Sequence, residues 1–375
     1  MQQQWRMASR VFLVVAAAFT LAFGAAGTDR GVASLPSFPE LGTVPRSGGF
    51  RMEGYWVWCG SVIRGDDGRY HLFASRWPKS IPFHPGWMTT SEIVRAVADR
   101  PAGPYAFQQV VLPARGAEWW DGRATHNPAI ARHGDTYVLF YMGSTHPFDD
   151  PAPGHPFPLT DPRAVVARSN KRIGVATATR LEGPWTRYER PVLDTRPGTF
   201  YSFLTSNPAP VIHAGGSVLL MFKARRYEGT THSGMMLGVA RAPHYLGPYD
   251  VVGDQPIFSS SRFGEVEDPF VWNTGDGYEM VAKDMTGKLA GEKHAAIHAR
   301  STDGTDWTLA DPPKAWSRTL RFDDGRTQTM GQLERPFLLI ENGRPTFLFA
   351  AAGDGPGGFA HMTESFNLAV PLLPE

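Results

Sequence analysis

The sequence predicts an all-β fold, a five-bladed β-propeller with four-stranded antiparallel blades, because one short β unit recurs five times. In each copy a turn ending in a small or polar residue runs into an apolar strand, and a Gly-containing turn leads to a second strand. Cys59, Asn127, Asn207, Asp268 and Arg335 open these units, so successive openings lie 68, 80, 61 and 67 residues apart. Regular recurrence of β units that cannot bury their faces alone is typical of a propeller.

A second repeated feature predicts the third and fourth strands of the blades. A Gly-Pro turn sets the hairpin after a third apolar strand, and the following aromatic ring packs between sheets. The spacing also exceeds the about 40 to 50 residues of the commoner propeller repeats. The repeated segments are Gly103-Pro104-Tyr105, Gly183-Pro184-Trp185, Gly247-Pro248-Tyr249 and, in a related form, Asp303-Gly304-Thr305-Asp306-Trp307.

Residues 1–26 have the pattern of a secretory signal peptide. Arg6 and Arg10 form a basic start, an apolar run follows from Val11 to Phe23, and the segment ends in small residues. This run of 13 residues is shorter than the about 20 residues that a membrane span needs. We therefore expect a secreted or periplasmic protein without membrane attachment after cleavage. An uncleaved N-terminal anchor is the alternative.

Composition bounds the domain organisation and the partners. Residues 27–49 are predicted to form a lead-in segment, and residues 50–375 a single propeller that is the catalytic domain. Cys59 is the only cysteine, which excludes an intramolecular disulfide, and the net charge of +1 gives no reason to expect nucleic acid. No close-spaced metal motif or phosphate-binding loop occurs, so we predict no metal and no cofactor. The oligomeric state is left open.

The innermost strand of each propeller blade lines the central channel, so the residues that open these strands are expected to converge on one end of the axis. Carboxylates then come from the fourth and fifth blades, and amides from the second and third. The converging residues are Trp58, Cys59, His126, Asn127, Ser206, Asn207, Glu267, Asp268, Glu334 and Arg335.

Several segments resemble the arabinanase, levansucrase and invertase superfamily of glycoside hydrolases over about residues 50 to 365. Families 43 and 117 are the most similar, and the mannoside phosphorylases of family 130 come next. The resemblance implies a five-bladed propeller that acts on a poly- or oligosaccharide. It is carried by the five-bladed units, the X-Pro strand openings, the Gly-Pro-Trp/Tyr hairpins and Ser301-x-Asp303-Gly304-x-x-Trp307. Five further segments resemble bacterial secreted proteins described only as glycoside hydrolases: Thr125-His126-Asn127-Pro128, Ser206-Asn207-Pro208-Ala209, Glu267-Asp268-Pro269-Phe270, Lys283-Asp284-Met285-x-Gly287 and Glu334-Arg335-Pro336.

The resemblance to family 43 also implies roles for three positions. The acid glutamate falls on Glu267, which precedes Asp268-Pro269. The aspartate that tunes the acid's pKa falls on Asn207, and the base aspartate falls on Cys59. Two of the three positions are therefore changed, which puts the usual family 43 mechanism in doubt but not the fold.

Glycoside hydrolysis needs two ionisable groups flanking one bond, and the sequence offers several candidates. Asp268 has an alternative interpretation as an Asx-Pro turn, and Asp284 one as an ion pair with Lys223 or Lys283. Glu267 and Glu334 have an alternative interpretation as partners of Arg225, Arg226 or Arg335. These arginines could equally clamp a uronic-acid or sulfated sugar. The catalytic candidates are Glu267, Asp268, Asp284 and Glu334, and the substrate-binding candidates are Trp58, His126, Asn127, Asn207, Lys223, Arg225, His294 and Arg335.

These observations predict a secreted, exo-acting glycoside hydrolase with a carbohydrate substrate. Glu267 is expected to be the general acid with a raised pKa, and Asp268, Asp284 or Glu334 the second member of the pair. A phosphorylase is the first alternative, favoured if Lys223, Arg225 and Arg226 face the channel. The second alternative is a non-catalytic carbohydrate-binding propeller, which the changes at Cys59 and Asn207 allow.

Overall fold

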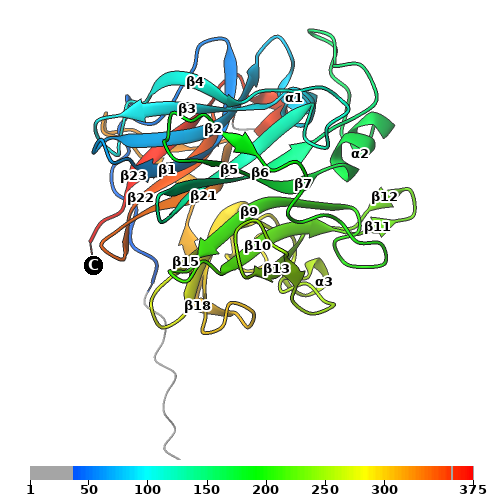
Figure 1. Cartoon of the computed structure of the whole chain (residues 1–375). Coiled ribbons are helices and arrows are strands. Elements are labelled where there is room, and N and C mark those ends of the chain that lie inside the picture. Colours follow the sequence, from blue (N-terminus) through cyan, green and yellow to red (C-terminus); the bar gives the residue numbers. More distant parts are fainter. Residues whose placement is uncertain (1–36, 356–357, 375) are drawn as a thin grey trace, which may run out of the picture. The chain divides into compact units, whose positions relative to one another are not determined.

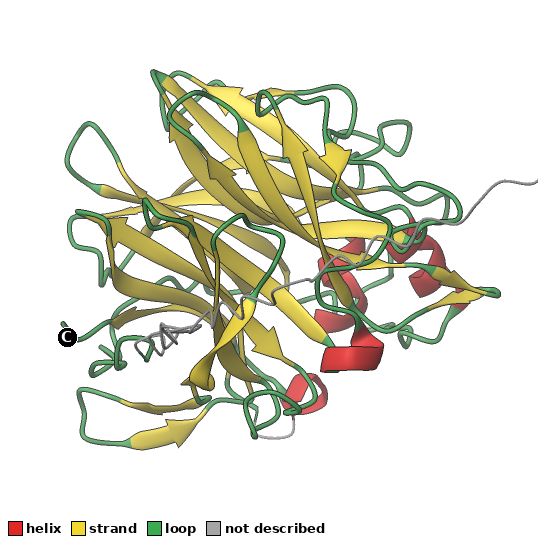
Figure 2. Ribbon diagram, turned by 90° about the horizontal axis from the view of Figure 1, so that it is seen from below, coloured by secondary structure: helices red, strands yellow, loops and turns green. Residues whose placement is uncertain are grey.

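The structure, a computed structural model, describes residues 37–355 and 358–374. The predicted signal peptide and residues 27–36 of the lead-in segment lie outside the described residues. Five antiparallel sheets are arranged as the blades of a propeller (Figures 1 and 2), which confirms the predicted fold. No helix in the described part of the chain is long and apolar enough to cross a membrane.

The first four blades each contain four antiparallel strands that follow one another in chain order from the axis outward. Blade I contains β1 (Tyr55–Arg64), β2 (Tyr70–Pro78), β3 (Glu92–Ala98) and β4 (Ala106–Leu112). Blade II contains β5 (Ala124–His133), β6 (Thr136–Ser144), β7 (Arg172–Ala178) and β8 (Thr186–Arg187). Blade III contains β9 (Leu204–Ile212), β10 (Val218–Arg225), β13 (Met236–Ala242) and β14 (Asp250–Val251), and blade IV contains β15 (Val266–Asn273), β16 (Tyr278–Asp284), β17 (Ala295–Ser301) and β18 (Thr308–Trp316).

Blade V is completed by the segment that precedes blade I. Its sheet has three strands, β21 (Gln332–Glu341), β22 (Arg344–Gly353) and β23 (Ser365–Pro371). Phe50 forms an antiparallel bridge with Asn367 on the outer side of β23, and the Phe50 ring is fully buried. The segment around Phe50 therefore joins the last blade to the first and closes the ring.

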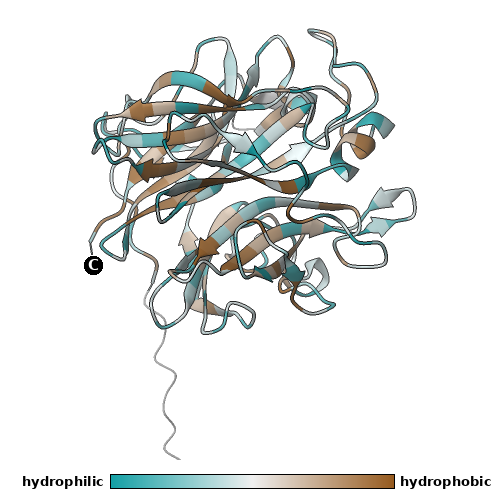
Figure 3. Ribbon diagram, viewed as in Figure 1, coloured by the Kyte–Doolittle hydropathy of each residue, from teal (hydrophilic) through white to brown (hydrophobic). Residues whose placement is uncertain are grey.

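Apolar side chains from neighbouring blades form the cores between them. Phe140 of β6, Val175 of β7 and Phe222 of β10 are fully buried in one cluster between blades II and III. Each such side chain contributes roughly 1.5 to 3 kcal/mol on leaving water. Figure 3 shows the same pattern over the molecule, with the most apolar residues concentrated in the strands.

The short helices lie at the end of the channel where the innermost strands begin. The start of β1 pairs with the end of β2, and the start of β5 pairs with the end of β6, so the loops that follow β2 and β6 lie at this end. Figures 1 and 2 show these loops and the helices gathered on one side of the molecule. We call this end the mouth. The elements at the mouth are α1 (Phe83–Thr89), α2 (Pro162–Ser169), α3 (Ser260–Phe263), η1 (Gly358–His361) and the hairpin of β11 (Tyr227–Glu228) and β12 (Thr231–His232). A second hairpin, β19 (Thr319–Arg321) with β20 (Thr327–Thr329), precedes blade V.

Every innermost strand carries a β-bulge at the residue that opens its repeat. The pairing register shifts at this point in all five blades, and proline follows the bulged residue in four of them. A bulge re-aims the side chain that it carries, and asparagine and aspartate tolerate a positive φ better than most residues. The bulged residues and their φ angles are Cys59 (50°), Asn127 (54°), Asn207 (51°), Asp268 (58°) and Arg335 (55°).

Candidate active site

The five bulged residues meet around the axis and form a connected set of side chains, here called the axial ring. The Cys59 thiol donates to Asn127 Oδ1 at 3.0 Å, and Asn127 Nδ2 donates to Asn207 Oδ1 at 2.7 Å. Asn207 Nδ2 donates in turn to Asp268 Oδ1 at 2.7 Å. The guanidinium of Arg335 lies 2.6 Å from the same carboxylate oxygen. The convergence predicted from the strand openings is therefore found.

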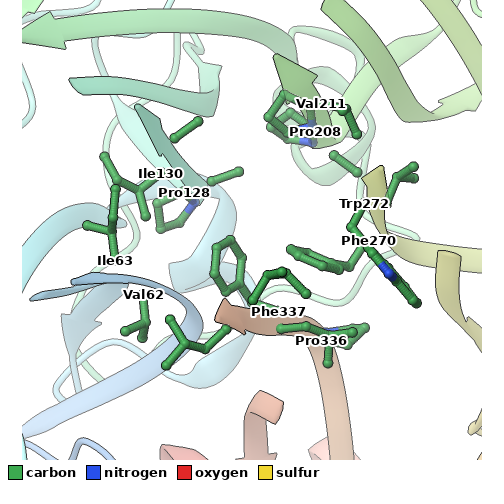
Figure 4. A pocket seen from close by; sticks show the side chains of 18 of the residues that line it. Val62, Ile63, Pro128, Ile130, Pro208, Val211, Phe270, Trp272, Pro336 and Phe337 are labelled. Carbon is green, nitrogen blue, oxygen red and sulfur yellow. The ribbon is translucent and has the colours of Figure 1, made fainter. Parts of the chain in front are cut away.

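A cavity lies beyond the axial ring, at the end of the channel away from the mouth. It has a volume of about 870 Å³. Figure 4 shows apolar side chains and prolines from the innermost strands around it, among them Ile63, Ile130, Val211 and Phe270. Polar side chains also line it, among them Arg64, Arg132 and Glu341. Of the ionisable residues predicted from the sequence, Asp268 and Arg335 of the ring line this cavity, but Glu267, Glu334, Lys223 and His294 do not. We therefore place the candidate active site at the mouth.

Two glutamates from adjacent blades lie side by side at the mouth. Glu267 and Glu334 each precede a ring residue, and both are buried. Together with Asp268 they bring one carboxylate oxygen each to within 4.8 Å of one another. Lysines share these carboxylates: Lys223 Nζ lies 2.6 Å from Glu267 Oε2, and Lys283 Nζ lies 3.8 Å from Glu267 Oε1 and also contacts Glu334.

The expectation that Glu267 holds a proton near neutral pH is wrong. Burial by itself would raise the pKa of Glu267, but the positive charges of Lys223 and Lys283 outweigh it, and the pKa lies below its ordinary value. Glu267 is therefore an ionised carboxylate. An ionised carboxylate suits a base or a nucleophile rather than a general acid.

Asp268 and Asp284 have their oxygens engaged by the protein itself. Asp268 belongs to the axial ring, where burial raises its pKa to about 6 although Arg335 opposes the shift. Asp284 is fully buried at the end of β16, and its carboxylate accepts hydrogen bonds from the backbone N–H groups of the loop before β17. This loop cap replaces the ion pair with Lys223 or Lys283 that the sequence suggested. The donors are Thr286, Gly287, Leu289 and Ala290, at 2.8 to 3.1 Å.

The predicted binding residues divide between the mouth and the packed interior. Trp58 is buried in an aromatic cluster, with its ring centre 5.0 Å from that of Phe83. Arg225 is buried and lies 3.6 Å from Glu265, whereas exposed Arg226 pairs with Glu228 on the β11–β12 hairpin. The three cations considered for a phosphate site therefore do not all face the channel.

His294 lies in the loop between β16 and β17, close to the glutamates. Its side chain is half-buried, and its Nδ1 has no hydrogen-bond partner in the described part of the chain. Burial and the positive charge of Lys283 lower the pKa of His294 to about 4. The imidazole is thus neutral at neutral pH, and its Nδ1 atom is buried without a partner in the described residues.

His126 links the axial ring to the mouth. Its Nδ1 lies 2.8 Å from Ser91 Oγ, and its Nε2 lies 3.6 Å from Cys59 Sγ. Burial and then the positive charges of Arg335 and Lys171 hold the pKa of His126 well below its ordinary value. Burial raises the pKa of the Cys59 thiol to about 12, so the neighbouring histidine does not produce a thiolate.

The neutral state of His126 predicts a loss of stability in acid. The unfolded chain takes up a proton near pH ~6.5, where an unperturbed histidine titrates. Folded His126 does so only at lower pH, so the unfolding free energy falls as the pH drops below about 6.5. Urea midpoints at pH 8 and pH 5.5 should show this loss, and His126→Gln should show less of it. The exposed His155→Gln variant serves as the control, and equal pH dependence in both variants would contradict this role for His126.

Comparison with known proteins finds the same architecture in solved structures of glycoside hydrolases. A family 117 glycoside hydrolase from the marine bacterium Zobellia galactanivorans has a TM-score of 0.62 at 15% identity, over 89% of this chain and 90% of that one. An endo-arabinase from Bacteroides thetaiotaomicron has a TM-score of 0.54 at 14% identity, over 91% of this chain and 99% of that one.

The chain has the fold of these glycoside hydrolases. A thermostable family 43 glycoside hydrolase gives a third example, with a TM-score of 0.56 at 12% identity, over 89% of this chain and 93% of that one. No protein-family model and no curated protein matches the sequence. The resemblance inferred from the strand openings is confirmed for the fold, and the activity has to be argued from the site.

Sequence reasoning missed two cations and an aromatic side chain that the loops of blades I and II bring to the mouth. Arg168 lies in the last turn of α2, and Lys171 lies just before β7. Trp87 of α1 lies under the Lys171 ammonium group, which is 3.8 Å from its ring centre. In the sequence these two basic residues simply follow the proline-rich loop. No local pattern shows which way that loop turns, so their place at the mouth could not be predicted.

Proposed function

We propose that the protein cleaves a glycosidic bond at the mouth of the channel, as an exo-acting glycoside hydrolase. The observation that carries this proposal is the pair of buried, lysine-bound glutamates at that end of the axis. Burying ionised groups is costly even when they are paired, and the apolar cores between the blades supply the stability of the ring without them. A costly pair of this kind at a channel mouth is better explained by chemistry than by folding.

In this proposal Glu267 is the ionised member of the catalytic pair. It acts as the base that activates water or as the nucleophile. Glu334 is proposed as the second member, the acid that protonates the leaving oxygen, because Asp268 and Asp284 have their carboxylates engaged in the axial ring and the loop cap. Lys283 contacts both glutamates and so holds the two side chains close together.

Two alternatives are each favoured by a specific observation. The changed positions Cys59 and Asn207 in the axial ring favour a propeller that binds carbohydrate without cleaving it. The cations at the mouth favour phosphorolysis, in which phosphate takes the place of water. Incubation of the mature protein with plant and algal oligosaccharides, with and without phosphate, followed by NMR of the products, separates the three. Release of a free reducing sugar without phosphate supports hydrolysis, and an unchanged substrate that still binds contradicts it.

Export is proposed from the sequence of residues 1–26. The N-terminus of the protein recovered from the native host's envelope or medium is expected near Gly27. Edman sequencing or mass spectrometry of that material checks the position. Cytosolic protein that keeps Met1 would contradict export.

A further inference from the structure

Two cations at the mouth have no acidic partner. Neither Arg168 nor Lys171 forms an ion pair or a side-chain hydrogen bond with any residue in the ranges that the structure describes. Lys171 is only 4% exposed, and its ammonium group lies over Trp87. An ammonium group buried to this extent is costly without a counter-charge.

The adjacent blade does not supply that counter-charge. On blade III, Lys223 and Arg225 are already matched by acidic residues, at 2.6 Å to Glu267 and 3.6 Å to Glu265. Burial and then the charges of Lys223 and Arg168 hold the pKa of Lys171 well below its ordinary value. Arg168 and a protonated Lys171 have no matching carboxylate within ion-pair distance in the described part of the chain, so an anion bound beside them would favour the charged form of Lys171 and be stabilised by both groups.

Aromatic side chains adjoin these cations. Trp87 is half-buried, its ring centre lies 6.1 Å from that of His126, and half-buried His84 packs edge-on beside it. The ring of a sugar can stack on such a surface. The apolar surface lies beside the two unmatched cations, so a ligand that carries a sugar ring and an anionic group would use both.

We propose that the mouth binds an acidic sugar, whose carboxylate or sulfate group contacts Lys171 and Arg168 while its ring lies against Trp87. The inference rests on the proposed function, because it names the substrate class of the same site. Arginine suits such a group through paired N–H donors, and Lys171 adds a buried charge that solvent ions screen little.

The test measures binding rather than turnover. Isothermal titration calorimetry compares D-galacturonate and D-galactose 6-sulfate with neutral D-galactose and with inorganic phosphate, using the full mature protein. Lys171→Met removes the charge but keeps a long apolar stem, and Arg168→Gln is a second variant at a half-buried position. Arg226→Gln is the matched control, since Arg226 is exposed and paired with Glu228.

An acidic sugar is expected to bind more tightly than D-galactose, and Lys171→Met and Arg168→Gln to weaken it by about 10- to 100-fold, the scale of one charged hydrogen bond. Arg226→Gln should bind like the wild type. Equal binding of acidic and neutral sugars would overturn the inference, and so would binding of phosphate alone. Acidic-sugar binding that depends on Lys171, without cleavage of any glycan, would sustain this inference while the hydrolase proposal failed.

Discussion

Replacing Glu267 with glutamine is expected to lower the turnover of a cleavable glycan by about 100-fold or more, the usual scale for a positioned acid or base. The amide keeps the size of the side chain but cannot take a proton or attack carbon. Initial rates give the change in turnover, and calorimetry should show that the sugar still binds. Glu341→Gln is the control, because Glu341 borders the cavity at the opposite end of the channel.

The Glu267 variant also leaves Lys223 and Lys283 without one of their partners. Breaking a buried ion pair costs about 3 to 5 kcal/mol, so a loss of activity could reflect unfolding. The double variant Glu267→Gln with Lys223→Met removes charges of both signs and should recover much of this stability without recovering turnover. A folded Glu267→Gln protein with wild-type turnover would show that the catalytic carboxylate has been misassigned.

Replacing Asp268 with asparagine is expected to lower the free energy of unfolding by about 3 to 5 kcal/mol, because it leaves the Arg335 charge buried without a partner. Asparagine tolerates the positive φ of this bulge as well as aspartate does, so backbone strain does not confuse the result. Guanidinium unfolding followed by tryptophan fluorescence measures the change.

Two comparisons isolate the charge of Asp268. Asp66→Asn breaks an exposed pair with Arg132 and should cost less than about 1 kcal/mol. The double variant Asp268→Asn with Arg335→Met removes both charges and should be more stable than Asp268→Asn alone. If Asp268→Asn costs no more than Asp66→Asn, the ion pair in the axial ring does not stabilise the fold.

The number of blades and the positions of their innermost strands follow from the sequence because they depend on local signals. Each of these signals spans only a few residues. They are a proline after the asparagine or aspartate that opens the strand, a glycine in the next turn and alternating apolar residues. Their recurrence then implies the propeller, and the propeller implies that Asn127, Asn207 and Asp268 meet at the axis. The structure confirms the fold and this meeting.

The pairing of charges could not be predicted in the same way. Whether Glu267 is protonated depends on Lys223 and Lys283, which reach it from other strands, and a change of a few ångströms reverses the direction of its pKa shift. Nothing in the sequence around Asp284 shows that four backbone N–H groups of the following loop donate hydrogen bonds to its carboxylate. The course of a loop is set by packing rather than by local pattern.

The sequence by itself determined the repeated strands and the set of residues carried to the axis, since these depend on neighbours along the chain. Only the tertiary structure decided that the segment around Phe50 completes blade V, that Glu267 is held ionised, and that Arg168 and Lys171 reach the mouth. Each of these features depends on groups far apart in sequence, whose burial and distance fix their electrostatic energy.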